Sequence, residues 1–404
     1  MDKKTLNMNV LSLFDGMSCG QHALQRAGIQ VDKYYASEID KYAIKVTLAN
    51  YPDTIQLGSV VDVDGYRLPK IDLLIGGSPC QSFSFAGKRK GMSTKDEQEI
   101  LTLDHYLQLK SEGYEFEGQS YLFWEYIRLL NECKPTYFLL ENVEMGEKWE
   151  KVLSKAIGVN GIHINSALVS AQNRKRIYWT NIGMKPAGLF GDLSSIIEQP
   201  KDKGILLKDI LEEEVDEKYF LSEKAIDRFA RSEGGDKCLD NENKSMCLIS
   251  GYYKQGRDNQ LIVHNTMPRS STTGKGGTGH LSRNDGKTYC LDTGNTNAVE
   301  IVLTSKDKRL QKIIDDNTFI KGDIAHLDTY NQTIDKDKSP ALKLPHNDRF
   351  LYDTSRIRRL TPIECERLQT VADNYTNHVS DSQRYKCLGN GWTVDVIAHI
   401  FKYI

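Results

Sequence analysis

A cysteine stands directly after a short apolar segment of this chain, in a stretch too polar to be core. The residues KIDLLIGGSP, 70–79, lead into Cys80, and the polar residues QSFS, 81–84, follow it. A structural cysteine is usually a small buried hydrophobe. The cations of GKRKG, 87–91, come shortly afterwards, and positive charge nearby favours the nucleophilic thiolate. We therefore interpret Cys80 as a candidate nucleophile; the alternative is a turn cysteine without a chemical role.

A carboxylate ends another apolar segment. Glu141-Asn142-Val143 closes the run YFLL, 137–140. A carboxylate at the rim of an apolar floor is well placed to exchange protons with a bound molecule. The alternative is a surface acid at the end of a strand.

Three side chains that could bind an anion or a base alternate in SAQNRKRIYW. They are Gln172, Arg174 and Arg176. Alternate residues of an extended strand share one face, and two guanidiniums with an amide suit phosphate or base contacts. An exposed edge strand with salt bridges is the alternative.

A glycine-containing turn near the N-terminus is a candidate ligand site. In FDGMSCG, 14–20, Gly16 and Gly20 bracket a turn into a helix, where backbone can approach a ligand and free N–H groups are available. It is not the G-x-G-x-x-G pattern, so a nicotinamide cofactor is poorly supported. Glu38 ends the next apolar segment and could bind ribose hydroxyls, with Ile39 offering an apolar face. The alternative is a tight turn and a solvated acid.

Alternating strand-like and helix-like segments must position these groups. Residues 1–185 predict strands near 9–14, 33–39, 70–77 and 135–143, two more strand-like runs within 164–183, and helices near 20–28, 40–51 and 122–134. Such alternation predicts a doubly wound α/β fold with a mainly parallel sheet. Its ligands are expected at the carboxyl ends of the strands, near the switch point.

The composition of the chain changes from about residue 186. The charged segment 201–226 is expected to be helical, and residues 230–300, rich in Gly, Ser, Thr and Asn, predict short strands and many turns. Helix signals return in LTPIECERLQTV, where Thr361 is a plausible N-cap with Pro362 and Glu364 following. The last residues, 387–404, predict a Gly-Asn turn and a closing helix.

Composition limits the class of protein. The eight cysteines include no C-x-x-C pair, which argues against a zinc site or a disulfide framework and favours a reducing cytosol. No apolar stretch reaches the roughly 18 residues of a membrane helix, and we identify no signal peptide. The net charge of −2 means that binding to a polyanion would need a local basic face.

Taken together, these motifs resemble the cytosine-5 DNA methyltransferases. The resemblance covers residues 1–185 and roughly the last 50 residues, and it rests on motifs that occur in the family's order. They are FDGMSCG, Glu38, GGSPCQSFSFAGKRKG, GQSYLF, Glu141-Asn142-Val143, QNRKR, RRLTPIECERLQ and LGNGWTVDV.

The resemblance implies a Rossmann-like methyltransferase sheet and a covalent mechanism. In it the Cys80 thiolate adds to carbon 6 of cytosine, Glu141 holds ring nitrogen 3 and the amino group, and carbon 5 takes the methyl group of S-adenosyl-L-methionine. Arg174 would stabilise the adduct, with Arg176 in support. The product would be S-adenosyl-L-homocysteine, and no metal is expected.

The resemblance also implies a cofactor site and a division into domains. The cofactor residues would be Phe14, Asp15, Gly16, Ser18, Glu38, Ile39, Asp62, Pro79, Leu122, Asn390 and Val394. The catalytic domain would comprise 1–185 and 346–404, because its C-terminal segment packs beside the first strand, and 186–345 would be an inserted β-rich target-recognition domain. Where relatives carry an acid just after a glycine, this chain has Gly58-Ser59, so whether Ser59 or Asp62 serves the adenine stays open.

The implied substrate is double-stranded DNA, whose target base must be flipped out of the helix. The SFAGKRKG segment would close on the DNA, and its basic residues would meet phosphates. The candidate DNA contacts are Gln81, Ser84, Lys88, Arg89, Lys90 and Gln172, with Arg257, Arg269 and Arg283 in the recognition module. For any one of these arginines, a surface loop is the alternative.

We expect a monomer on DNA, no membrane partner, and the cytoplasm of a bacterial cell, with the gene on a phage as one source. An RNA (tRNA) cytosine-5 methyltransferase and a non-catalytic DNA-binding paralogue are the rival functions. Residues 93–118 form an insertion whose role is open: a helix flanking the DNA, or a regulatory or contact element. The recognition sequence cannot be read from the chain.

Overall fold

A computed structural model describes most of the chain outside its central region. The described residues are 7–79, 92–96, 98–187, 192–220 and 356–404, together with the backbone of short strands at 238–239, 261–268, 280–283, 326–328 and 333–335. They fall into two compact units, which we describe separately. The first comprises 1–214, 243–259 and 361–404, and the second 215–242 and 260–360.

The first unit is built on a seven-stranded sheet in the order β3-β2-β1-β4-β5-β7-β6. β1 to β5 pair in parallel, β7 runs antiparallel to β5, and β6 runs antiparallel to β7. The strands are β1 Met8–Leu13, β2 Val31–Ser37, β3 Ile55–Gln56, β4 Leu73–Gly77, β5 Tyr137–Val143, β6 Ile162–Asn165 and β7 Lys175–Thr180. The predicted doubly wound α/β fold is confirmed.

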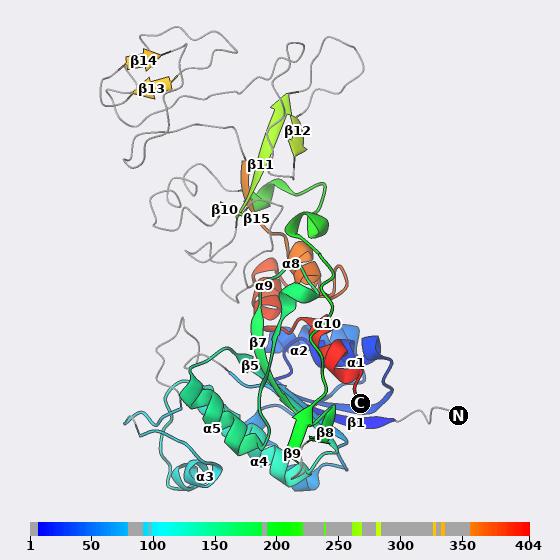
Figure 1. Cartoon of the computed structure of the whole chain (residues 1–404), viewed down its shortest axis with the longest axis vertical. Helices are drawn as coiled ribbons and strands as arrows, with labels where there is room; N and C mark the ends of the chain where they lie inside the picture. The colour runs from blue at the N-terminus through cyan, green and yellow to red at the C-terminus, as the bar shows by residue number, and fades with distance from the viewer. Residues whose placement is uncertain are drawn as a thin grey trace. The chain divides into compact units, whose positions relative to one another are not determined.

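Helices cover both faces of this sheet (Figure 1), with α1, α2 and α10 on one side and α4 and α5 on the other. The α-helices of the described residues are α1 Cys19–Ala27, α2 Lys41–Asn50, α3 Leu103–Ser111, α4 Phe123–Cys133, α5 Glu147–Ile157, α8 Pro362–Leu368, α9 Asp381–Asn390 and α10 Val394–Phe401. Short 3-10 turns occur at η1 Val60–Asp62, η2 Gly65–Arg67, η3 Ser120–Leu122, η4 Ser166–Leu168, η5 Leu207–Ile210 and η6 Glu217–Tyr219.

Local sequence signals set several of these helix boundaries. α1 ends at Gly28, whose φ of 75° is the left-handed cap that glycine favours. The Asp40 side chain accepts a hydrogen bond from the Tyr42 N–H and begins α2. α8 begins with the predicted capping box of Thr361 and Glu364 around Pro362. These boundaries confirm the predictions made from the sequence.

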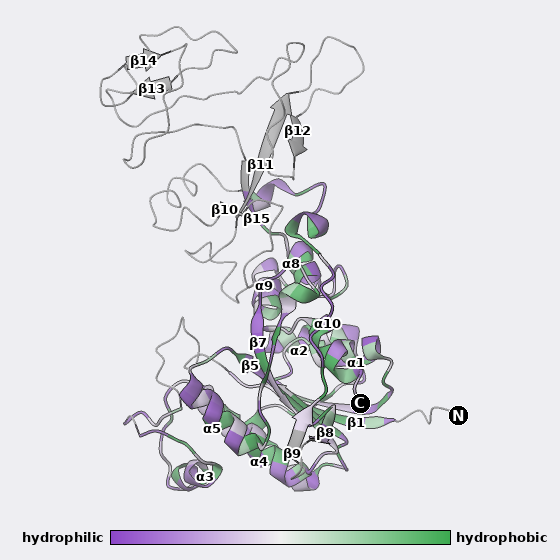
Figure 2. Cartoon of the chain, viewed as in Figure 1, coloured by the Kyte–Doolittle hydropathy of each residue, from purple (hydrophilic) through white to green (hydrophobic). Residues whose placement is uncertain are grey.

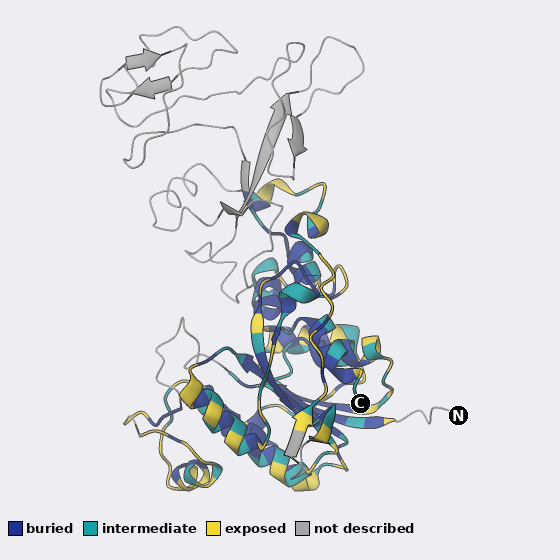
Figure 3. Ribbon diagram, viewed as in Figure 1, coloured by how far each residue is buried: buried dark blue, intermediate teal, exposed yellow. Residues whose placement is uncertain are grey.

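The hydrophobic core lies between the central strands and the helices that cover them. Leu11 of β1, Leu74 of β4 and Leu140 of β5 are fully buried, and they belong to one core cluster with Phe123 and Trp124 of α4. Figures 2 and 3 show the apolar and the buried residues coinciding along these strands. Central parallel strands are covered on both faces, which is why their sequences are continuous apolar runs.

The order of the strands defines a switch point between β1 and β4. From β1 the chain continues to β2 on one side of it, and from β4 it continues to β5 on the other. In open sheets of this kind, ligands bind beyond the carboxyl ends of the strands at the switch point. The turn after β1 and the segment after β4 are therefore the places to look for a site.

The C-terminal segment packs against the first βα unit. The Tyr375 hydroxyl donates to the Met17 carbonyl at 2.7 Å, and Lys386 of α9 pairs with Asp40 at 2.5 Å. Arg26 of α1 also forms an ion pair with Asp395 of α10. Residues more than 300 positions apart thus share one end of the sheet.

The helix predicted over residues 201–226 is wrong for the part that the structure describes. Only the short turns η5 and η6 form there, and 221–226 lie outside the described residues. The backbone finds partners in α8 instead. Arg367 donates to the Ile210 carbonyl at 2.9 Å, and the Glu212 N–H donates to Glu364 at 2.9 Å. Tertiary contacts therefore replace the intrahelical hydrogen bonds that the composition favoured.

The described part of the second unit consists of the turn η6 and several short strands. β11 Leu261–Pro268 pairs with β10 Cys238–Leu239, β12 His280–Arg283 and β15 Arg356–Arg359, and β13 His326–Asp328 pairs with β14 Thr333–Asp335. The first unit has a further hairpin of β8 Met184–Ala187 and β9 Asp192–Ser195. Across the described ranges of both units, no helix has the length and apolarity needed to cross a membrane.

Candidate active site

The turn after β1 has an unusual backbone that its residues hold in place. Phe14, Gly16 and Ser18 all have positive φ angles, of 56°, 59° and 59°. The Gly16 N–H donates to Glu38 Oε2 at 2.8 Å. Glycine adopts this conformation without strain, so the turn brings its backbone to the end of β2.

The carboxylate of Glu38 is fixed at the end of β2. Its Oε2 accepts from Gly16, and its Oε1 accepts from the Ile39 and Asp40 N–H groups at 2.7 and 2.8 Å. Ile39 beside it is apolar and 71% exposed. An oriented carboxylate next to an open apolar side chain fits a nucleoside, with hydroxyls on the acid and a base on the apolar face. The residues present therefore fit the implied S-adenosyl-L-methionine.

Asp15 braces the turn from within. Its carboxylate accepts a hydrogen bond from the Tyr34 hydroxyl at 2.7 Å and another from Ser18. Burial raises the pKa of Asp15 to about 6, although the hydrogen bonds from Ser18, Ser12 and Tyr34 oppose that shift. Ser18 itself is fully buried. Both residues therefore shape the turn.

The other predicted cofactor residues have mixed exposure. Asp62 lies exposed on η1, Asn390 is exposed at the end of α9, and Pro79 and Leu122 are half-buried. Val394 is fully buried in the first turn of α10, and its N–H donates to the Gln369 carbonyl.

The register of β4 with β5 places a carboxylate beside the carboxyl end of β4. Gly77, the last residue of β4, pairs with Glu141, which is only 8% exposed. Glu141 Oε1 lies 2.9 Å from Arg176 Nε, and Glu141 Oε2 accepts from Trp392 Nε1 at 3.1 Å. One oxygen of the carboxylate therefore lies in an ion pair with Arg176, and the other accepts a hydrogen bond from Trp392.

The segment after β4 is tied to the same strand. The Asn142 amide donates to both the carbonyl and the hydroxyl of Ser78, at 3.2 and 3.0 Å. Asn142 and Ser78 are both buried. The end of the GGSP motif and the Glu-Asn-Val motif are thus joined directly, and Cys80 is the second residue after Ser78.

Several predicted residues lie outside the described part of the chain. They are Cys80, Gln81, Ser84, Lys88, Arg89, Lys90, Arg257 and Arg269. Of Arg283, the structure describes only the backbone at the end of β12, where it pairs with Asn265.

The alternating residues before and within β7 are largely buried. Arg174 is 4% exposed and donates to the carbonyls of Gly389 and Gly391 at 3.4 and 2.9 Å. Gln172 is fully buried and donates to the Leu368 carbonyl at 3.2 Å. A direct DNA contact by Gln172 would require its side chain to leave this position. Gln172 and Arg174 thus hold the C-terminal segment, and Arg176 pairs with Glu141. The alternative of an exposed edge strand did not predict these contacts.

Sequence reasoning missed three residues of the site: Trp392, Ser78 and the amide of Asn142. Each lies inside a motif that was singled out, beside a residue that received a role. Trp392 stands between Asn390 and Val394 in LGNGWTVDV. The available signal was its indole N–H, which usually has a hydrogen-bond partner when a tryptophan is buried, next to glycines that allow close packing.

The insertion after the GKRKG segment packs against α4. Glu125 of α4 is fully buried. It accepts hydrogen bonds from Tyr106 at 2.5 Å and from Lys110 at 2.6 Å, both of α3. Arg128 of α4 adds an ion pair at 2.7 Å. Met92 and Ile100 are fully buried in the same core cluster. The insertion is therefore a structured part of the first unit.

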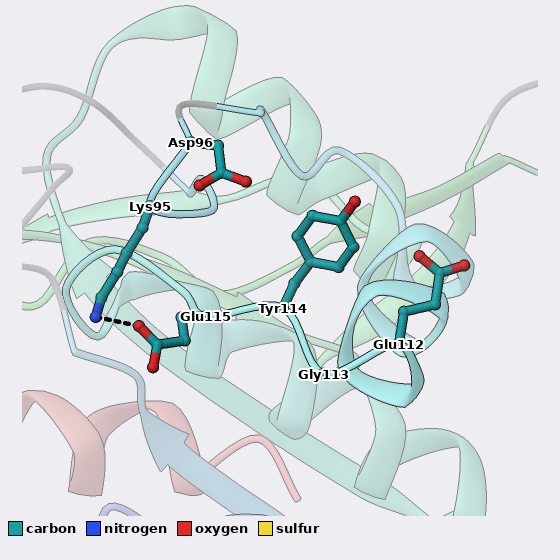
Figure 4. A pocket seen from close by; sticks show the side chains of 6 residues that line it. All are labelled: Lys95, Asp96, Glu112, Gly113, Tyr114 and Glu115. Carbon is teal, nitrogen blue, oxygen red and sulfur yellow. Dashed lines mark hydrogen bonds and ion pairs between the residues drawn. The ribbon is translucent and has the colours of Figure 1, made fainter.

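A shallow pocket of about 330 Å³ lies within this insertion (Figure 4) and includes none of the strand-end residues. It is lined by Lys95, Asp96, Glu112, Gly113, Tyr114 and Glu115. Lys95 is already paired with Glu115. The remaining acids would repel phosphates, so this pocket does not support the helix-flanking-DNA hypothesis.

The fold is that of a Rossmann-like α/β protein, and the residues at its strand ends fit a nucleoside. The sequence model of the C-5 cytosine-specific DNA methylase family matches residues 8–404, and the chain belongs to that family.

Relatives match along most of the chain. Orphan methyltransferase M.SPRI of Bacillus phage SPR is 30% identical, covering 98% of this chain and 97% of that protein. Type II methyltransferase M1.ScrFI of Lactococcus lactis subsp. cremoris is 28% identical, covering 67% and 68%. A mutant DNMT2 structure from Spodoptera frugiperda is 19% identical with a TM-score of 0.54, covering 98% and 99%. That last likeness concerns the fold alone.

Proposed function

We propose that this protein is a DNA cytosine-5 methyltransferase that acts on a flipped-out cytosine in a specific duplex sequence through a covalent bond to Cys80. The observation that carries the proposal is the pairing of Gly77 with Glu141. Through this pairing, the Glu141 carboxylate lies beside the end of β4, the strand that leads into Ser78, Pro79 and Cys80. Family membership supplies the class of reaction.

The chemistry follows from what cytosine lacks. Carbon 5 is a weak nucleophile, and addition of the Cys80 thiolate to carbon 6 makes the ring enamine-like. Glu141 contacts ring nitrogen 3 and the amino group, and shares a proton as charge develops there. Loss of the proton from carbon 5 and departure of the thiolate then restore the aromatic base. Arg176 orients Glu141, and Arg174 holds the link between α9 and α10 through the Gly391 carbonyl.

S-adenosyl-L-methionine, when bound, supplies the electrophilic methyl group for carbon 5. Glu38 would hold the ribose hydroxyls and Ile39 the adenine. Gly16 would bring backbone close to the cofactor, with Phe14 beside it. Either Ser59 or Asp62 would contact the adenine amino group.

We further propose a catalytic domain of residues 1–185 and 346–404 and a target-recognition domain of 186–345. Lys88, Arg89 and Lys90 would meet DNA phosphates, and Arg283 is one candidate for base readout. The named relatives are orphan and type II methyltransferases of phages and bacteria, which supports a role in DNA methylation or restriction–modification in the bacterial cytoplasm.

Transfer of tritium from methyl-labelled cofactor tests the substrate. We expect label in plasmid DNA and none in tRNA; label in tRNA alone would favour the RNA methyltransferase alternative. Bisulfite sequencing of DNA from expressing cells would then give the recognition sequence.

Trapping on a duplex that contains 5-fluorocytosine tests the covalent step. The wild type should form an adduct that survives denaturation, and Cys80→Ser should form none. A wild type that binds DNA without an adduct would be the non-catalytic paralogue. An adduct with Cys80→Ser would show that another nucleophile acts.

A further inference from the structure

Trp392 has a hydrogen bond to the site that the proposed mechanism does not use. We propose that Trp392 is a positioning residue, which fixes the orientation of the Glu141 carboxylate for the cytosine ring edge. This inference rests on the proposed function and deepens it. Its basis is the 3.1 Å hydrogen bond from Trp392 Nε1 to Glu141 Oε2, between residues 251 positions apart.

The two oxygens of Glu141 are held from different elements. Arg176 Nε lies 2.9 Å from Oε1, and Arg176 belongs to β7, the antiparallel neighbour of β5. Trp392 reaches Oε2 from the short link between α9 and α10. A carboxylate oxygen can accept more than one hydrogen bond. With an ion pair at one oxygen and a hydrogen bond at the other, the carboxylate is held from two elements and retains capacity for the substrate.

The link that carries Trp392 is itself braced on both sides. Arg174 donates to the Gly391 carbonyl at 2.9 Å. On the other side, the Thr393 hydroxyl donates to the side chain of Gln369 at 3.0 Å, and Gln369 donates to the Leu388 carbonyl at 2.6 Å. The indole therefore approaches Glu141 from a backbone whose neighbours are hydrogen-bonded.

Gly77 leaves room for this contact. A Cβ atom at Gly77 would lie 2.8 Å from Trp392 Nε1 and 3.0 Å from Glu141 Oε2. Both distances are too short for a carbon in ordinary contact with these atoms. The last residue of β4 is thus a glycine where the indole and the carboxylate meet, which places their hydrogen bond against the strand that leads to Cys80.

A preorganised carboxylate needs no reorientation when charge develops on the ring, and such preorganisation lowers the barrier. Trp392 therefore contributes to the rate of the chemical step. A side chain that only lined the cofactor site would instead contribute to cofactor affinity. The two roles separate experimentally as effects on the rate constant and on binding.

The first experiment compares Trp392→Phe with the wild type in single-turnover methyl transfer to duplex DNA. Phenylalanine keeps an aromatic ring and removes the donor. We expect the rate constant to fall about 10-fold or more, in line with the loss of a hydrogen bond to a charged group, with little change in the dissociation constant for the cofactor. A loss of cofactor affinity at an unchanged rate constant would overturn the proposal.

Trp179→Phe is the matched control. Trp179 is fully buried on β7, and its Nε1 donates to Ser154 at 2.8 Å, so the substitution also removes an indole donor and leaves the site untouched. We expect lower thermal stability and an unchanged rate constant. An equal fall in rate for both variants would show a general effect of packing and would overturn the proposal.

A double-mutant cycle tests whether Trp392 acts through Glu141. The readout is the rate of adduct formation on the 5-fluorocytosine duplex, for Trp392→Phe, Glu141→Ala and the double variant. We expect Trp392→Phe to cost almost nothing once Glu141 is absent. Losses that multiply in the double variant would overturn the proposal.

Gly77→Ala provides a second route if Trp392→Phe does not fold. Its methyl group would separate the indole from the carboxylate while both side chains remain, so the same fall in rate is expected; a wild-type rate would overturn the proposal. The wild type in each series reports on the proposed function separately, because a wild type without methyl transfer or adduct contradicts that function, whatever the variants do.

Discussion

The side-chain amide of Asn142 donates to the carbonyl and the hydroxyl of Ser78, at 3.2 and 3.0 Å. Its own oxygen accepts from the Val143 N–H at 2.8 Å. The end of β5 therefore holds the chain that leaves β4, two residues before Cys80. This contact relates two sequence motifs that are more than 60 residues apart.

Replacing Asn142 by alanine should slow catalysis by loosening that connection. We expect methyl transfer to fall about 10-fold or more, because buried polar groups of Ser78 lose their partner. Asn181→Ala is the control, since Asn181 caps the opposite end of β5 through Phe138 N and the Thr136 carbonyl. It should lower the melting temperature and leave the rate constant in place. Equal rates for Asn142→Ala and wild type would contradict this role.

Glu38→Ala should weaken cofactor binding far more than DNA binding. The substitution removes the acceptor for Gly16, Ile39 and Asp40 as well as the proposed ribose contact. We expect the dissociation constant for the cofactor to rise about 10- to 100-fold, measured by calorimetry. Glu112→Ala, on the exposed face of the insertion, should leave both affinities unchanged. Equal losses of cofactor and DNA affinity would argue against a cofactor role for Glu38.

Asp15 should make stability depend on pH. Burial raises its pKa from 3.8 to about 6, so between these values the folded state binds more protons than the unfolded state. The free energy of unfolding should therefore fall as pH rises from 4 to 6, and stay lower above 6. We expect the decline to be on the order of 2 kcal/mol and to be absent in Asp15→Asn. Urea unfolding of both proteins across this range measures the difference, and parallel curves would contradict it.

Two buried thiols should resist alkylation in the folded protein. Burial raises the pKa of Cys19 and of Cys387 to about 12, and the thiolate is the reactive form. Iodoacetamide at pH 8 should leave both unmodified, as peptide mass mapping would show. The same treatment in urea should modify both. Modification of folded Cys19 at the rate seen in urea would contradict this burial.

The sequence predicted the elements that periodicity and capping specify. The apolar runs gave β1, β4 and β5 close to their observed bounds, and Thr361 with Glu364 located the start of α8. The helix predicted over 201–226 was wrong for residues 201–220, because the backbone near Ile210 and Glu212 bonds to α8. No local pattern reports such a partner.

The acids of the candidate site were predictable from the sequence, and their contacts were not. Glu38 and Glu141 could be found as acids at strand ends, because parallel strands bring their carboxyl ends together. The donors on Glu141 depend on the antiparallel return of β7 and on the link after α9. Contacts over such separations arise from the folded topology alone.

The packing of α9, α10 and their link against the first βα unit has a consequence for truncated chains. Trp392 and Asp395 follow all seven strands of the sheet in the chain, so a chain that stops before them lacks the hydrogen bond to Glu141 and the ion pair with Arg26. Truncation before residue 392 should therefore leave the Glu141 carboxylate without its indole donor, although every strand of the seven-stranded sheet is present.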